Sequence, residues 1–216
     1  MTSPLDFFRH IQRQDWGEEA LSFLVGGGWC AAFFITIGVF LTQYLVIGGS
    51  LFEKVAPHEI LYVLPAVIVL GLTFFMMTYI LVGAAVVGFV VVLFGILGII
   101  LYGAVKLIAK KGILGDSLKA SFYSSAVIQA AIAITAVAVL VKFRVVDFNY
   151  FLVAENIIYI LAVIYMWGLQ SIGCRRAHDT TRFLSIIAAS IPFIIAVLIN
   201  WGFNVAVLPK FAPWLS

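Results

Sequence analysis

Charged side chains are scarce in this sequence. Of its 216 residues, 13 are Lys or Arg and 10 are Asp or Glu, so only 11% are charged, whereas soluble domains carry about 25%. Because 64% of the residues are hydrophobic as well, a soluble globular fold is excluded. Charge is wholly absent from five stretches, namely 20–52, 60–105, 120–141, 156–174 and 183–209. Since about 20 apolar residues cross a bilayer core, the pattern predicts an all-α, polytopic transmembrane helical bundle.

Carboxylates are also lacking from the interiors of these stretches. Each Asp or Glu is expected outside or at the rim of an apolar core: Asp6, Asp15, Glu18, Glu19, Glu53, Glu59, Asp116, Asp147, Glu155 and Asp179. Proton pumps and many ion-coupled transporters keep an ionisable group near mid-membrane. The sequence therefore argues against proton-coupled or cation-coupled transport, and it leaves open a facilitated pore lined by uncharged polar groups.

Cysteine and histidine are few. Cys30 and Cys174 are expected to be buried and do not suit a disulfide framework. His10, His58 and His178 form no pattern typical of a haem or zinc site. With no Walker sequence, nucleophile elbow or paired-Cys motif, the sequence predicts no enzyme, no cofactor and no metal site. The net charge of +3 does not imply nucleic acid, because cytoplasmic loops of membrane proteins carry such an excess.

The chain is expected to form one membrane domain. The pattern of residues 1–20 predicts a short amphipathic helix in the interface. Residues 21–208 are expected to form the transmembrane domain, and residues 209–216 a short tail. Four spans are predicted clearly, within 21–47, near 122–141, near 157–173 and near 183–206.

The remaining charge-free stretch, 60–105, is too long for one ordinary span. As a single helix it would be about 69 Å long, against a hydrocarbon core of about 30 Å. We therefore expect it to bend, break or cross twice. Pro65 and several glycines supply places to do so: Gly71, Gly83, Gly88, Gly95, Gly98 and Gly103.

Basic residues distinguish one crossing of this stretch from two. With one crossing there are five spans, and one side collects nine basic residues: Arg9, Arg13, Lys106, Lys110, Lys111, Lys119, Arg175, Arg176 and Arg182. The other side has four: Lys54, Lys142, Arg144 and Lys210. With two crossings there are six spans, and the best division is eight against five. Because cytoplasmic loops are enriched in Lys and Arg, five spans with a cytoplasmic N-terminus are favoured, and six remain the alternative. With five spans, residues 84–105 would form a half-helix on the cytoplasmic side, an interfacial segment or a long kinked continuation of the span.

Two groups of residues are candidates for binding. The basic residues Lys106, Lys110, Lys111, Lys119, Arg175, Arg176 and Arg182 would contact anionic lipid headgroups or a partner, unless they only set orientation. The uncharged polar residues Gln129, Gln170, Asn200 and Asn204 lie within predicted spans. They would hold helices together or line a pore.

Three short motifs occur together around the predicted spans. They are Ser3-Pro4-Leu5-Asp6-Phe7-Phe8 before the first span, Leu118-Lys119-Ala120-Ser121-Phe122-Tyr123-Ser124-Ser125-Ala126 at the third, and Gly168-Leu169 through Arg175-Arg176-Ala177-His178-Asp179-Thr180-Thr181-Arg182 between the fourth and fifth, with Pro192 in the last span. This combination resembles the Yip-domain family of Rab-interacting membrane proteins. The resemblance covers most of the chain except 84–112, and it implies five spans and a cytoplasmic N-terminus. The chain lacks the long hydrophilic N-terminal region of the eukaryotic members, so it is more similar to short prokaryotic relatives, and the resemblance alone does not imply binding of small GTPases.

The leading functional prediction is a non-enzymatic integral membrane scaffold or accessory subunit. It would assemble with other membrane proteins, or with itself, through helix faces rich in small residues. One alternative is a small-solute channel or facilitator. A second is a cofactor-free subunit of a redox or energy-converting complex. The expected location is the bacterial cytoplasmic membrane, with lipids and membrane proteins as partners and no nucleic acid.

Overall fold

The computed structural model describes residues 18–44, 48–50, 55–56, 58–110 and 112–215. Regular structure in this part of the chain is helical, and five helical segments are long and apolar enough to cross a membrane. The predicted all-α class and its five spans are therefore confirmed. The interfacial helix predicted over 1–20 falls almost entirely on residues 1–17, which lie outside the described part of the chain.

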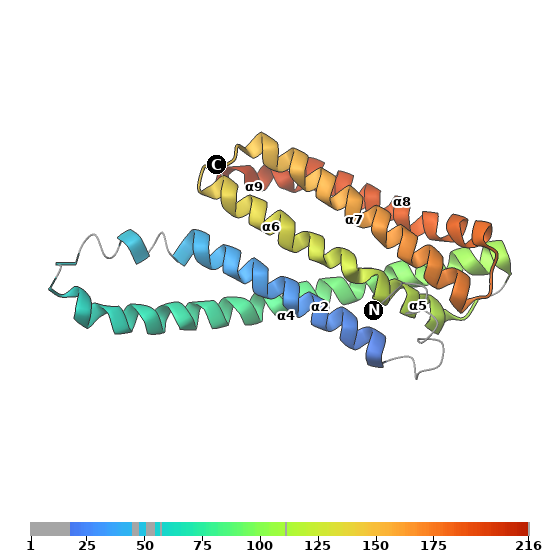
Figure 1. Cartoon of the computed structure of the whole chain (residues 1–216), viewed down its shortest axis with the longest axis horizontal. Helices are drawn as coiled ribbons and strands as arrows, with labels where there is room; N and C mark the ends of the chain where they lie inside the picture. The colour runs from blue at the N-terminus through green and yellow to red at the C-terminus, as the bar shows by residue number, and fades with distance from the viewer. Residues whose placement is uncertain (1–17, 45–47, 51–54, 57, 111, 216) are drawn as a thin grey trace.

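The helices follow one another in alternating directions, as Figure 1 shows. In chain order they are α2 (Glu18–Val39), the π-helical turn η1 (Phe40–Tyr44), α4 (Ile60–Ala109), α5 (Leu114–Tyr123), the 3-10 turn η2 (Ser124–Ile128), α6 (Gln129–Lys142), α7 (Phe148–Ala177), α8 (Arg182–Ala206) and α9 (Leu208–Leu215). Helices α5 and α6, joined by η2, make one crossing. The short helix α9 covers most of the segment predicted as a tail.

Alternation of direction separates the basic residues. The end of α4, the start of α5, the end of α7 and the start of α8 lie together (Figure 1). We name this the basic end, because it carries Lys106, Lys110, Lys119, Arg175, Arg176 and Arg182. The opposite end, named the far end, carries Lys142, Arg144 and Lys210. The described residues thus have the charge asymmetry on which the five-span prediction rested; Lys111 is outside them.

Of the outcomes expected for residues 60–105, a break and a double crossing do not occur. Instead, α4 is one helix of 50 residues, about 75 Å long at about 1.5 Å per residue. Its glycines do not break it, since several serve as contact points. A Cβ added to Gly71 would lie 2.7 Å from the Tyr44 ring, and one added to Gly98 would lie 2.8 Å from Leu118. Packing against neighbours therefore maintains the helix at positions of low helix propensity.

The core of the bundle lies around the second half of α4. Leu24 of α2, Phe94 and Leu97 of α4, Met166 of α7 and Ala196 of α8 belong to one buried cluster. A second cluster lies toward the basic end and a third toward the far end. In its second half α4 packs against α2, α5 and α8, whereas its first half meets mainly α2 and η1. The first half of α4 is therefore covered much less.

The first half of α4 projects past the far end of the bundle (Figure 1). We name residues 60–82 the α4 arm. Apart from the side that meets α2, its large apolar side chains are exposed: Leu61, Tyr62, Leu64, Ile68, Val69, Leu70, Leu72, Phe74, Met76, Met77, Ile80 and Leu81. The arm is therefore an apolar helix with one covered side.

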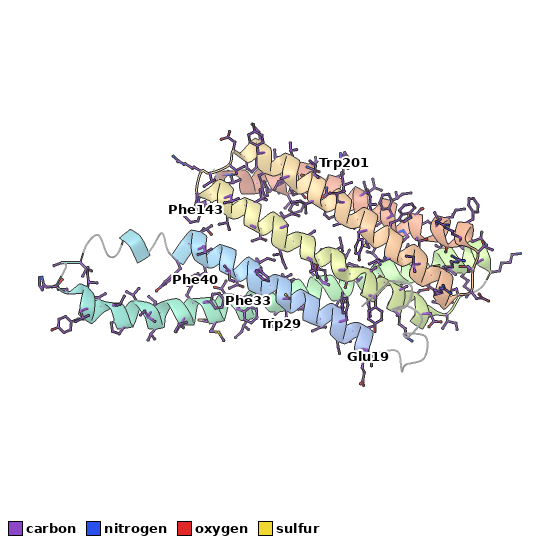
Figure 2. The ribbon with its side chains drawn as sticks, viewed as in Figure 1. Glu19, Trp29, Phe33, Phe40, Phe143 and Trp201 are labelled. Carbon is purple, nitrogen blue, oxygen red and sulfur yellow. The ribbon has the colours of Figure 1, made fainter. Side chains whose placement is uncertain are left out.

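Aromatic side chains join the arm to α2. The ring centroids of Trp29 and Tyr79 are 5.3 Å apart, and those of Phe40 and Phe75 are 5.7 Å apart. Figure 2 shows Trp29 and Phe40 on the side of α2 that faces α4. Edge-to-face pairs at such distances contribute about 0.5–1.5 kcal/mol each beyond area burial. These contacts fix α2 and the arm as a pair.

Candidate functional site

The inward face of α7 carries polar groups at two levels. Glu155 and Asn156 lie near the far end, whereas Gln170 and His178 lie toward the basic end. The buried residues Val163 and Met166 separate the two levels. We name the first group, with its partners on α8, the far-end polar cluster.

Asn156 is the hub of this cluster. Its Oδ1 accepts hydrogen bonds from Asn200 Nδ2 at 3.3 Å and from Asn204 Nδ2 at 3.2 Å. Its own Nδ2 donates to the carbonyl of Leu152 at 2.8 Å. One turn further along α7, the Tyr159 hydroxyl donates to the carbonyl of Ala196 at 3.0 Å. These bonds join α7 to α8, so the predicted pair Asn200 and Asn204 acts in helix contact here.

Glu155 lies directly beside this hub, and its burial was not predicted from the sequence. It is about 10 Å along the axis from the start of α7, and only 4% of it is exposed. Its Oε2 atom is buried without a hydrogen-bond partner. The sequence did not reveal this burial. The charge-free stretch 156–174 begins one residue after Glu155, so that the pattern predicts the edge of a span at Glu155.

The other predicted polar residues do not join the cluster. Gln170 is 0% exposed, and neither its Oε1 nor its Nε2 has a hydrogen-bond partner. Gln129 is exposed at the start of α6. The four residues proposed as a pore lining therefore occupy three separate environments.

At the basic end, His178 connects two loops. It is 6% exposed, its Nε2 is 2.9 Å from Ser117 Oγ, and its Nδ1 accepts from the backbone N–H of Ile113 at 3.5 Å. Burial lowers the pKa of His178 below its ordinary value, and the nearby Asp116 carboxylate opposes this in part. An acceptor role for Nδ1 requires that Nε2 carry the proton of the neutral ring. His178 is thus a neutral structural link between the α4–α5 and α7–α8 connections.

Predicted basic contact residues lie around this link. Lys106, Lys110, Arg175 and Arg182 are exposed, whereas Lys119 and Arg176 are partly buried. Lys106 Nζ also lies 5.4 Å from the centre of the Tyr102 ring, close enough for a cation–π contact. Lys111, predicted with them, lies outside the described residues. The exposed cations form a surface suited to anionic headgroups.

Metal-ligating side chains do not cluster in the described part of the chain. No group of three or more His, Cys, Asp or Glu residues there is arranged to hold a metal ion. Cys174 is buried as expected, but Cys30 is exposed on α2 and corrects that part of the prediction. The exposed thiol of Cys30 therefore lies at the surface of the bundle rather than in its core.

The motifs that resemble the Yip-domain family occupy defined places. Tyr123 ends α5 and Ser124 begins η2, where Ser121 Oγ donates to the carbonyl of Phe94 at 2.8 Å. Pro192 is fully buried within α8. Gly168 of α7 has open space around the position of an added Cβ. No protein-family model, no curated protein and no solved structure matches the chain, so the resemblance stays a prediction based on these motifs.

Proposed function

We propose that this protein is a non-enzymatic membrane scaffold or accessory subunit that binds another integral membrane protein through the α4 arm. The observation that carries the proposal is the length of α4 together with the exposure of its first half. A helix of about 75 Å exceeds even the 40–45 Å or so that a bilayer spans with its headgroups. Lipid therefore does not cover all of the apolar surface of an upright α4.

Water is an equally poor environment for the arm. Tyr62 is 82% exposed and Leu61 is 75% exposed, and no charged residue occurs from 60 to 105. Soluble proteins rarely leave apolar patches larger than a few hundred Å² uncovered. An apolar helix of another subunit would cover the arm without burying an unpaired polar group.

The chemistry of the arm suits adaptable packing. Met76 and Met77 are unbranched and adjust to irregular surfaces. Such contacts between membrane helices depend on van der Waals packing rather than on exclusion of water. The partner surface is accordingly expected to be a transmembrane helix, from a second copy of this chain or from another protein. Membership of the Yip-domain family belongs to the same proposal and is supported only by its motifs.

Site-specific photocrosslinking in native membranes tests this proposal. A photoreactive amino acid replaces Met77 in the arm, and a matched control replaces Leu161, which is exposed on α7. We expect a protein adduct from position 77 and mainly lipid adducts from position 161. The mass of the adduct distinguishes a second copy from another protein. Lipid adducts alone from position 77, or equal protein capture from both positions, would refute the proposal.

A further inference from the structure

Glu155 is unusual among the described carboxylates of the spans. Glu18 and Glu19 lie in the first turn of α2, and Asp116 lies in the first turn of α5. Glu155 instead lies two turns inside α7 and is buried against α8. Intramembrane ionisable groups that face the interior of a bundle commonly have functional roles.

The surroundings of Glu155 do not supply what an ionised carboxylate needs. Its Oε2 has no hydrogen-bond partner. Asn204 offers the carboxyl group a side-chain hydrogen bond, but the same amide nitrogen also donates to the Oδ1 of Asn156 and, at 3.1 Å, to the carbonyl of Asn200. A primary amide nitrogen has only two hydrogens to donate. A buried anion with so few donors is costly, whereas a protonated carboxyl carries no charge.

Charged and titratable groups near α7, on the helices that pack against it and in the connection before it, gather mainly toward the two ends of the bundle. On α8 the charged residue is Arg182, at the basic end. On α6 it is Lys142 and on α9 it is Lys210, both at the far end; α9 meets the start of α7 where Leu208 shares a buried cluster with Phe151. On α5 the groups are Asp116, Lys119 and Tyr123, in the half of the bundle near the basic end. Arg144 and Asp147 are in the connection before α7, and Tyr159 is one turn beyond Glu155 on α7 itself.

We propose that Glu155 is a proton-binding site, held between α7 and α8 and loaded from the far end through the contact of Asn156 with Asn204. Loading adds one proton from the aqueous phase to a carboxylate oxygen and removes one negative charge, and unloading reverses this. No other bond changes. The site goes beyond the scaffold role and does not depend on the α4 arm.

The geometry limits exchange to one side. Asn156 and Asn204 are only partly buried, and the start of α7 is about 10 Å away along the helix axis. Toward the basic end, the buried side chains of Val163 and Met166 separate Glu155 from Gln170 and His178. The pH at the far end should therefore govern the occupancy of the site.

Labelling with dicyclohexylcarbodiimide tests the site in the full-length chain reconstituted into vesicles. This apolar reagent modifies protonated carboxyl groups, and mass spectrometry of peptides locates the adduct. We expect an adduct on Glu155 whose formation slows as the pH at the far end is raised. The same change at the basic end should have no effect. Glu155→Gln should lose the adduct, and Glu59→Gln, at an exposed carboxylate, should retain it.

Two further measurements make the result decisive. Labelling should be equal in sodium chloride and in choline chloride. If sodium protected Glu155 from the reagent, the site would bind a metal cation instead of a proton, and the proposal would be overturned. Infrared spectra should contain the carbonyl band of a protonated carboxylic acid, and the band should disappear in Glu155→Gln and persist in Glu59→Gln. Absence of both the adduct and the band in a chain of native helical content would refute the proposal.

Discussion

The indole of Trp29 on α2 lies directly over Gly83 of α4, and adding one methyl group to Gly83 should weaken the pair. A Cβ at this position would lie 2.0 Å from Cζ3 of Trp29 and 2.5 Å from its Cε3, whereas carbon atoms pack at about 3.5–4.0 Å. The indole would have to move by roughly 1.5 Å to restore that spacing, and Tyr79 is already stacked edge-on at a centroid distance of 5.3 Å. Overpacking of this kind costs about 1–3 kcal/mol.

Gly88 on the same helix provides a matched control. A Cβ added there meets nothing within 4 Å, so Gly88→Ala should gain the helix-propensity difference of about 0.8–1.0 kcal/mol. Gly83→Ala receives the same gain and bears the clash in addition. The free energy of unfolding of Gly83→Ala should therefore fall about 1–3 kcal/mol below that of Gly88→Ala. Denaturant titration in detergent, followed by circular dichroism, measures the difference, and equal stability of the two variants would refute the packing argument.

Three other predictions concern the inward face of α7. The pKa of His178 is lowered in the folded state from its ordinary 6.5, so that on acidification the unfolded chain takes up the proton at a higher pH than the folded chain does. The contribution of His178 to the free energy of unfolding should therefore be complete above pH 6.5 and should be lost as the pH falls below it. Thermal unfolding should show a weaker acid dependence in His178→Gln, and an unchanged dependence would contradict this role. Gln170→Leu removes two buried polar atoms without partners and should raise the unfolding free energy by about 1–3 kcal/mol; a lower value in a denaturant titration would contradict this. Asn156→Leu removes the acceptor shared by Asn200 and Asn204 and should lower that free energy by about 1–2 kcal/mol; no change in a denaturant titration would contradict the hub assignment.

The number of spans could be predicted because the positions of charged residues along the chain follow the topology directly. Lys and Arg are costly to translocate and mark the connections, so the charge asymmetry favoured five spans before any helix was placed. The residues at which the helices begin and end were harder to predict. The third span was expected near 122–141, but its helical segment starts at Leu114 and includes the η2 turn, since polar Ser side chains pack inward there.

The sequence left the continuity of α4 open, because a glycine can have two different roles in a helix. A glycine weakens a helix in isolation, and it also permits another element to approach closely. Only the positions of Trp29 and Tyr44 against Gly83 and Gly71 show that the second role applies. The pairing of α2 with α4 depends on residues far apart in the chain, and the local sequence around each glycine does not show it.

The burial of Glu155 escaped prediction for a related reason. A charge at the edge of an apolar stretch usually marks the membrane surface. Here α7 starts seven residues earlier, at Phe148, and rotates Glu155 toward α8. Asn200 and Asn204 were singled out as polar residues of a span, but their partner Asn156 is on a different helix and was not.

The central claim is that α4 crosses the membrane once, and cysteine accessibility at its two ends tests it most directly. Cys30 and Cys174 are first replaced by Ala, and single cysteines are then introduced as His58→Cys and Ile113→Cys, at exposed positions before and after α4. In sealed vesicles of known orientation, a membrane-impermeant maleimide should label one of these positions from outside and the other only after the vesicles are opened. Labelling of both positions from the same side would contradict a single crossing and would require the hairpin of a six-span protein.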